Sequence, residues 1–182
     1  KIEHHAVLYT IKELQRTHGI QADFVKLDAF GRVDYEDLER LLNIDDKKTL
    51  VSLMHVNNEI GCVLDLKRVA LMCKEYNTLF HSDTVQSVGH FEMDFSEIPI
   101  DFAAVAAHKF HGPKGAGFAF IRKTNRVQPL IFGGEQERGL RAGTEAVYAI
   151  VGMAEALKFS YQNLEAERAY VTDIKNYFKN EI

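Results

Sequence analysis

A lysine next to a histidine separates two apolar runs of the chain. Residues 104–122 read AVAAHKFHGPKGAGFAFIR, with His108 and Lys109 at the end of the first run and a Gly/Pro turn before the second. A lysine becomes a nucleophile toward carbonyl groups when its surroundings lower its pKa, as a crevice with few carboxylates does. Lys109 could therefore form a Schiff base, whereas a lone lysine in such a turn is more often a solvated loop residue.

A carboxylate, Asp83, lies at the end of another apolar run. Asp83 ends the segment LFHSD, and Gln86 lies three residues further on. A carboxylate at a buried strand end must be paired or hydrogen-bonded to stay charged, so Asp83 either caps a turn or serves a ligand. Gln86 bonds either the backbone or a ligand. A buried carboxylate and a Schiff-base lysine are two groups of a pyridoxal phosphate site, in which the carboxylate keeps the pyridinium nitrogen protonated.

Two glycine-rich segments could bring backbone N–H groups to a phosphate. They are HGPKGAG at residues 111–117 and GGEQERGLRAGTE at residues 133–145. Neither has the GxxxxGK[ST] or GxGxxG spacing of the better-defined phosphate loops. Taken alone, both indicate an anion site only weakly.

Alternating helices and strands must position these groups. Apolar residues recurring every three or four positions predict helices over residues 6–19, 33–43, 64–77 and from Thr144 toward the end of the chain. Apolar, β-rich or alternating runs predict strands over residues 21–31, 49–56, 78–83, 101–108 and 115–122. The helix over 33–43 is expected to begin at Asp34 as its N-cap, and the strand over 49–56 to be buried on both faces. On the long helix the expected core face is Val147, Ile150, Val151, Ala154, Leu157, Tyr161 and Leu164.

This order of elements predicts an α/β fold. Helices between successive strands imply parallel pairing, while the short turn between 101–108 and 115–122 implies an antiparallel pair. Ligands of open α/β sheets bind beyond the carboxyl ends of the strands. The polar residues expected there, in one site, are Asn57, Asn58, Glu59, Asp83, Gln86, His108 and Lys109.

Composition excludes several classes of partner. The chain has 182 residues, of which 46% are hydrophobic and 26% charged, and a net charge of -4 without basic blocks, so we expect no nucleic acid and no membrane as partner. Two cysteines, Cys62 and Cys73, suggest neither a disulfide framework nor a metal site, and we expect both to be small buried apolar residues in a cytoplasmic protein. Both ends fall within helical patterns, so we expect a piece of a longer protein.

Five segments, in order along the chain, closely resemble the cysteine desulfurases of the NifS and IscS type. They read EHHAVL, MHVNNEIG, HSDTVQSVG, AHKFHGPKGAG and GGEQERGLRAGTE, and the resemblance extends from Glu3 to about Leu157. It implies the type I pyridoxal phosphate-dependent transferase fold of class V aminotransferases, whose large domain has a mostly parallel sheet flanked by helices. Residues 1–165 would form the central part of that domain. Residues 166–182 would end the long helix that leads to a small domain outside the chain.

The resemblance also implies roles for the matching residues. His4 would stack on the cofactor ring and belong to the catalytic set. Asn58 would lie near the ring oxygen and the substrate carboxylate. Asp83 would pair with the pyridinium nitrogen, and Gln86 would donate to the phenolic oxygen.

Three further roles fall on the glycine-rich segments and the residues before them. His108 would contact the phosphate, and Lys109 would be the catalytic Schiff-base lysine that also acts as general acid and base. Thr144 would reach the phosphate bound by the partner subunit, which requires a homodimer.

The implied activity converts L-cysteine to L-alanine and passes the sulfur, as a persulfide, to an acceptor or iron–sulfur scaffold protein. A selenocysteine lyase, another class V aminotransferase, and an inactive dimerisation or interaction piece are the alternatives. Neither Cys62 nor Cys73 resembles the persulfide-carrying cysteine of the family, so these residues alone are not expected to desulfurate cysteine.

Two positions depart from the family pattern. Ala106 stands where a serine usually bonds the cofactor phosphate, and one hydrogen bond to a charged group is worth about 1.5–3 kcal/mol. Glu135 stands where the usual run has glycine, and it brings a negative charge to the segment expected to approach the partner subunit.

Overall fold

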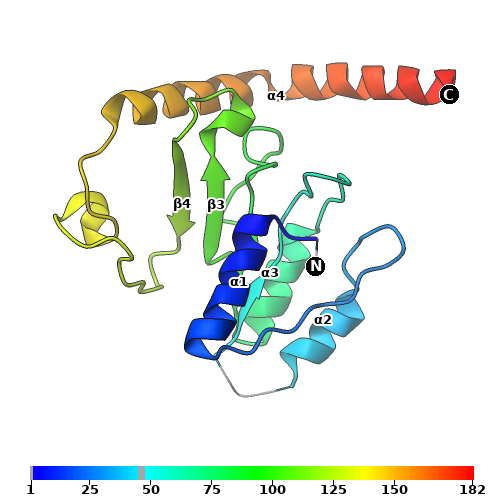
Figure 1. The fold of residues 1–182 in the computed structure, drawn as a ribbon. Helices are drawn as coiled ribbons and strands as arrows, with labels where there is room; N and C mark the ends of the chain where they lie inside the picture. Colours follow the sequence, from blue (N-terminus) through cyan, green and yellow to red (C-terminus); the bar gives the residue numbers. More distant parts are fainter. Residues whose placement is uncertain (1, 45–47) are drawn as a thin grey trace. The chain divides into compact units, whose positions relative to one another are not determined.

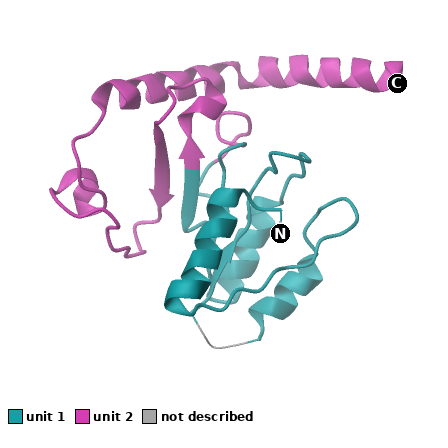
Figure 2. Cartoon of the chain, viewed as in Figure 1, with its two compact units in different colours: residues 1–86, 94–104 teal, residues 87–93, 105–182 magenta. Residues whose placement is uncertain are grey.

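The computed structural model describes residues 2–44 and 48–182 (Figure 1). The elements are α1 (His5–His18), α2 (Tyr35–Leu42), β1 (Leu50–Ser52), α3 (Leu66–Glu75), β2 (Leu79–Asp83), β3 (Phe102–Ala106), η1 (Ala107–Phe110), β4 (Gly117–Ile121), η2 (Gln136–Gly139) and α4 (Val147–Glu181). They fall into two compact units (Figure 2): unit 1 is Lys1–Gln86 with Asp94–Ala104, and unit 2 is Ser87–Met93 with Val105–Ile182. Within the described ranges, no helix is both long and apolar enough to cross a membrane.

The strands follow the order β1-β2-β3-β4 in one sheet. β2 pairs in parallel with β1, with Val51 opposite Phe80, and in parallel with β3, with Ser82 opposite Ala103. β4 follows the short turn after η1 and runs opposite to β3 (Figure 1). The predicted α/β class with a mostly parallel sheet is therefore confirmed, and so is the antiparallel pair at the short turn.

The core of unit 1 lies between α3 and β2, which pack against each other. The predicted period of α3 is confirmed, because its buried residues are Leu66, Val69, Ala70 and Cys73. Asp65 caps the helix by accepting a hydrogen bond from the Arg68 N–H (2.9 Å). Burial raises the pKa of the Cys73 thiol to about 12, so this cysteine is the inert, buried residue that we expected.

The strand predicted over residues 21–31 is wrong. The segment forms only an isolated antiparallel bridge between Leu27 and Val33. The Lys26 N–H, which would serve a neighbouring strand, donates instead to the Asp37 carboxylate on α2 (2.9 Å). A side chain eleven residues away thus replaces the ladder partner that the alternating pattern implied.

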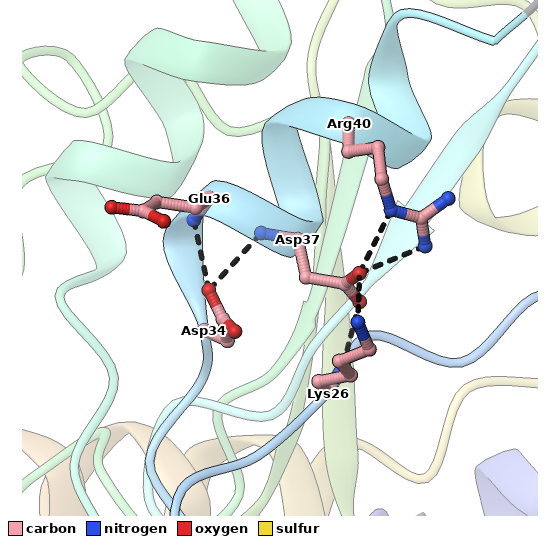
Figure 3. Close-up of polar contacts among 5 residues, drawn as sticks. All are labelled: Lys26, Asp34, Glu36, Asp37 and Arg40. Atoms are coloured by element: carbon pink, nitrogen blue, oxygen red, sulfur yellow. Dashed lines mark hydrogen bonds and ion pairs between the residues drawn. The ribbon is translucent and has the colours of Figure 1, made fainter.

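A buried carboxylate connects this segment to α2 (Figure 3). Asp34 is the N-cap, as predicted, and accepts from the N–H groups of Glu36 and Asp37 (both 3.0 Å). The Asp37 carboxylate forms ion pairs with Arg40 (2.8 Å) and with the Lys26 ammonium (3.4 Å). The backbone hydrogen bond from Lys26 and the side-chain bond from Arg40 lower the pKa of Asp37.

The strand predicted over residues 49–56 is shorter than expected and is not buried on both faces. Only Leu50–Ser52 is regular strand, and Leu50 is 54% exposed. The ladder nevertheless continues past it, because the N–H groups of Leu53 and His55 donate to carbonyl oxygens of β2 (3.2 and 3.0 Å). The extended conformation was therefore predictable, whereas the exposed outer face was not.

The long helix α4 begins at Val147 rather than at Thr144, and its buried face was predicted only in part. Leu164 is buried and Leu157 packs against the core of unit 2, as predicted. Val147, Ile150 and Val151 are exposed instead, and Ala149 and Ser160 are buried although they were not predicted. The core of unit 2 comprises Val88, Val105, Ala107 and Phe110, packed against Met93, Ala116, Met153, Ala156 and Leu157.

Replacing Asp37 by Asn should lower the thermal midpoint of unfolding at pH 7, because the amide cannot pair with both cations. The folded state lowers the pKa of Asp37, so its stabilising contribution is present above the unfolded-state pKa and disappears as the pH falls through the folded-state pKa. The gap between wild type and Asp37→Asn should therefore close below about pH 4. Glu13→Gln, which removes an exposed pair with Arg16, is the matched control and should change little. Equal midpoints for Asp37→Asn and wild type at pH 7 would contradict the assignment.

Candidate functional site

Asp83 is the buried carboxylate at the carboxyl end of β2, where the sequence predicts a site. Its side chain is 8% exposed, and Oδ1 accepts a hydrogen bond from the Val85 N–H (3.0 Å). The turn-capping role is thus present. Within the part of the chain that the structure describes, Oδ2 has no hydrogen bond, so this oxygen is available to a ligand. Gln86, three residues on, is partly buried.

A second carboxylate, Glu3, adjoins this strand end. Its Oε1 accepts from the Met54 N–H (2.8 Å), and the next residue, His55, donates its own N–H to the Asp83 carbonyl (3.0 Å). Glu3 Oε2 is buried and has no partner among the described residues. Burial, together with the negative charge of Asp83, raises the pKa of Glu3 from 4.5 to about 6. Two interacting carboxylates in a poorly solvated place favour a cationic ligand.

His81 precedes Asp83 on the same face of β2. Its Nδ1 lies 2.8 Å from the Ser52 hydroxyl oxygen, and burial lowers its pKa. The ring is therefore neutral at pH 7. It does not supply the positive charge that the two carboxylates favour.

Asn57 ties the segment before His4 to the turn after β1. Its buried Nδ2 donates to the Ile2 carbonyl (2.6 Å), and its Oδ1 accepts from the N–H groups of Glu59 and Ile60 (both 2.9 Å). The adjacent Asn58 is exposed, and its Nδ2 donates to Glu59 Oε1 (2.7 Å). The turn that presents Asn58 is thus held by its buried neighbour.

His4 is the N-cap of α1, a role that the sequence analysis missed. Its Nδ1 accepts a hydrogen bond from the Ala6 N–H (3.1 Å), so in the neutral ring the proton resides on Nε2. Histidine is not among the preferred capping residues, which explains why the capping pattern gave no signal. The ring itself is exposed and free to meet a ligand.

Lys109 lies in unit 2, on the short turn η1 that follows β3. Its neighbours Ala107 and Phe110 are fully buried. The turn closes when the Gly112 N–H donates to the Ala107 carbonyl (2.8 Å), and a Cβ at Gly112 would lie 2.8 Å from the Ala107 Cβ, so glycine is required there. Lys109 is partly buried, and its ammonium forms no ion pair among the described residues. His108 beside it is exposed.

The second glycine-rich segment folds on itself through Gln136. Its Oε1 accepts from the Gly143 N–H (3.0 Å), and left-handed backbone at Glu137, Arg138 and Gly139 forms the tip. Thr144 and Glu135 are both exposed. The partner-subunit role of Thr144 stays a prediction.

Cys62 is only partly buried, so the expectation that both cysteines are buried is wrong for this one. Its Sγ donates to the Phe30 carbonyl (2.8 Å). The thiol lies beside Gly31, whose left-handed backbone brings the residue 28–32 turn close to it.

Over residues 2–44 and 48–182, no group of three His, Cys, Asp or Glu side chains could hold a metal ion.

Each predicted site residue therefore has a defined place within its own unit. Unit 1 contains four of them: His4, Asn58, Asp83 and Gln86. In this unit, hydrogen bonds connect residues 2–3, the segment 54–57 and the end of β2. His108, Lys109 and Thr144 belong to unit 2.

The family model described as Aminotransferase class-V matches residues 1–182. This chain belongs to the class V aminotransferase family. Cysteine desulfurase IscS of Dictyoglomus turgidum is 40% identical to this class V chain over 182 residues, which cover 100% of this chain and 45% of that protein. The IscS of Clostridium botulinum is 40% identical over 175 residues, 96% of this chain and 43% of the relative.

Solved structures agree with the class V assignment. One named NifS-like protein matches with a TM-score of 0.93 at 40% identity, covering 98% of this chain and 49% of that one. SspA in complex with cysteine matches with a TM-score of 0.81 at 33% identity, and the match covers 86% of this chain and 45% of SspA. The predicted resemblance and fold are confirmed. The class V chain spans less than half the length of these relatives.

Substituting Glu3 by Gln should stabilise the protein near neutral pH. The folded state raises the pKa of Glu3, so the stability linked to its protonated form is fully present below the unfolded-state pKa and is lost as the pH rises through about 6. The neutral Gln retains an acceptor for the Met54 N–H and removes the repulsion from Asp83. We expect a gain on the order of 1 kcal/mol at pH 7.5 and almost none at pH 4.5, measured by urea unfolding. A variant less stable than wild type at pH 7.5 would refute the interpretation.

Proposed function

We propose that the protein containing this chain is a pyridoxal phosphate-dependent cysteine desulfurase, which converts L-cysteine to L-alanine and passes the sulfur on as a persulfide. The observation that carries the proposal is Lys109: a lysine without an ion pair in the described chain, on a turn fixed by buried neighbours. Family membership and 40% identity to proteins named cysteine desulfurase support it. The solved relative in complex with cysteine supports the choice of substrate.

The donor set of unit 1 fits a protonated pyridine ring. Asp83 offers a free carboxylate oxygen at a buried strand end, with Glu3 as a second carboxylate and a neutral His81 nearby. No cation among them competes for the Asp83 charge. When bound, pyridoxal phosphate supplies an electron sink for the electron pair left when the substrate Cα–H bond breaks.

The family resemblance assigns roles to residues of this chain. Asp83 would bind the pyridinium nitrogen, His4 would stack on the ring, and Gln86 would donate to the phenolic oxygen. Asn58 would orient the substrate carboxylate. His4 is exposed, so its ring is accessible to a ligand. The turn that carries Asn58 is held by hydrogen bonds to the Asn57 side chain, which is consistent with a binding role for Asn58.

In unit 2, Lys109 would hold the cofactor through its amine and, once the substrate amine replaces it, move the proton at the substrate Cα. His108 would contact the phosphate. Thr144 would contact the phosphate bound by the partner subunit of a homodimer. An acceptor protein for the sulfur, such as an iron–sulfur scaffold, and a cytoplasmic setting complete the proposal.

Lys109→Ala in the complete protein should reduce alanine release from L-cysteine at least about a hundredfold, the usual contribution of a proton-transferring group. The same variant should lose the saturable visible absorption band that appears when pyridoxal phosphate is titrated in. Lys114→Ala, an exposed lysine in the same turn, is the control and should retain both. Alanine release by Lys109→Ala at the wild-type rate would exclude the proposed role.

Ala106→Ser should tighten cofactor binding, because the hydroxyl restores a donor for the phosphate. One hydrogen bond to a charged group corresponds to about a tenfold or larger decrease in the dissociation constant. Titration of the complete apoprotein with pyridoxal phosphate measures the change, with Ala104→Ser, two residues earlier on the same face of β3, as control. Unchanged affinity in Ala106→Ser would show that position 106 does not contact the phosphate.

A further inference from the structure

The turn formed by residues 87–91 lies directly against η1 within unit 2. The Ser87 carbonyl accepts from the N–H groups of His90 and Phe91 (both 2.9 Å), which closes the turn. Gly89 has left-handed backbone, and a Cβ there would lie 2.7 Å from the Phe110 Cβ. The turn therefore rests on the ring that anchors the lysine-bearing segment.

The His90 imidazole contacts the main chain of Lys109. Its Nε2 lies 2.8 Å from the Lys109 carbonyl oxygen in a partly buried position. A carbonyl oxygen only accepts hydrogen bonds, so Nε2 must carry the hydrogen. The imidazolium also has this N–H, and the bond persists in either charge state.

α4 also contacts the turn. The Tyr161 hydroxyl takes a hydrogen bond from the Gly89 backbone, and the buried Ser160 Cβ would lie 3.5 Å from a Cβ at Gly89. The turn that carries His90 therefore contacts both η1 and α4.

We infer that His90 is a positioning residue for Lys109, an inference that rests on the function proposed above. Phe110 anchors the chain after Lys109 in the core, and His90 fixes the carbonyl between them. The Lys109 main chain is thus held while its side chain stays free to react. A displacement of the Lys109 Cα is carried to the amine, and a misplacement of 1 Å can reduce a rate by about a hundredfold.

Three substitutions in the complete holoenzyme test this inference. His90→Gln places a donor nitrogen near the position of the histidine Nε2, and His90→Asn places one near the position of Nδ1. His90→Ala provides no donor. With Phe110 still anchored, we expect kcat for alanine release from L-cysteine to fall about tenfold in His90→Ala and His90→Asn, and to stay within about twofold in His90→Gln. KM should change less than about twofold in all three.

Amide hydrogen exchange of the cofactor-free complete protein gives a second readout that needs no turnover. Exchange at residues 110–112 should accelerate in His90→Ala and His90→Asn and remain at the wild-type rate in His90→Gln. Equal kcat in all variants, or a His90→Gln variant as impaired as His90→Ala, would overturn the inference. If wild type releases no alanine, the proposed function fails, whereas the exchange pattern still reports whether His90 holds the turn.

Discussion

The pairing of β2 with a strand on each side is the constraint on which the candidate site in unit 1 depends. The main chain around Asp83 is held from both edges, because His55 donates to the Asp83 carbonyl and the Thr84 N–H donates to Ala104 (3.0 Å each). Phe80, three residues before Asp83, is fully buried and lies on a strand that packs against α3. With its backbone satisfied in this way, Asp83 needs only one oxygen for its own turn. The other can serve a ligand.

In unit 2, a short turn rather than a strand end carries the candidate residue. Lys109 lies on the four-residue turn η1, whose apolar members are buried and whose closure requires glycine at position 112. Small residues on α4 and at Gly89 let the surrounding segments approach the Phe110 ring. The Lys109 side chain thereby extends from a short turn with buried neighbours, which suits the proton-transferring role proposed for it.

The sequence predicted those elements whose determinants are local. The period and caps of α2 and α3 depend on residues within one or two turns, and both helices were found where expected. The segment 21–31 was not predictable, because the distant Asp37 carboxylate replaced the strand partner. On α4, Leu157 and Leu164 were predicted, whereas the buried Ala149 and Ser160 were not. Asp83 and Lys109 were proposed as site residues from residue type and position at or after the end of a strand, and their roles stay predictions. Glu3 and His90 were missed because their partners lie 51 and 19 residues away in the chain.

The charges around Asp83 would couple the stability of unit 1 to the binding of a cation there. Burying Glu3 near Asp83 disfavours its ionised form, as the raised pKa of Glu3 records, so at neutral pH the unliganded fold carries an unfavourable interaction. A cation bound at Asp83 would relieve it and return the pKa of Glu3 toward its ordinary value. By linkage, the affinity for such a cation rises as Glu3 loses its proton above about pH 6. The buried Glu3 Oε2, unbonded within the described chain, therefore leaves this end of β2 with a charge that a bound cation could compensate.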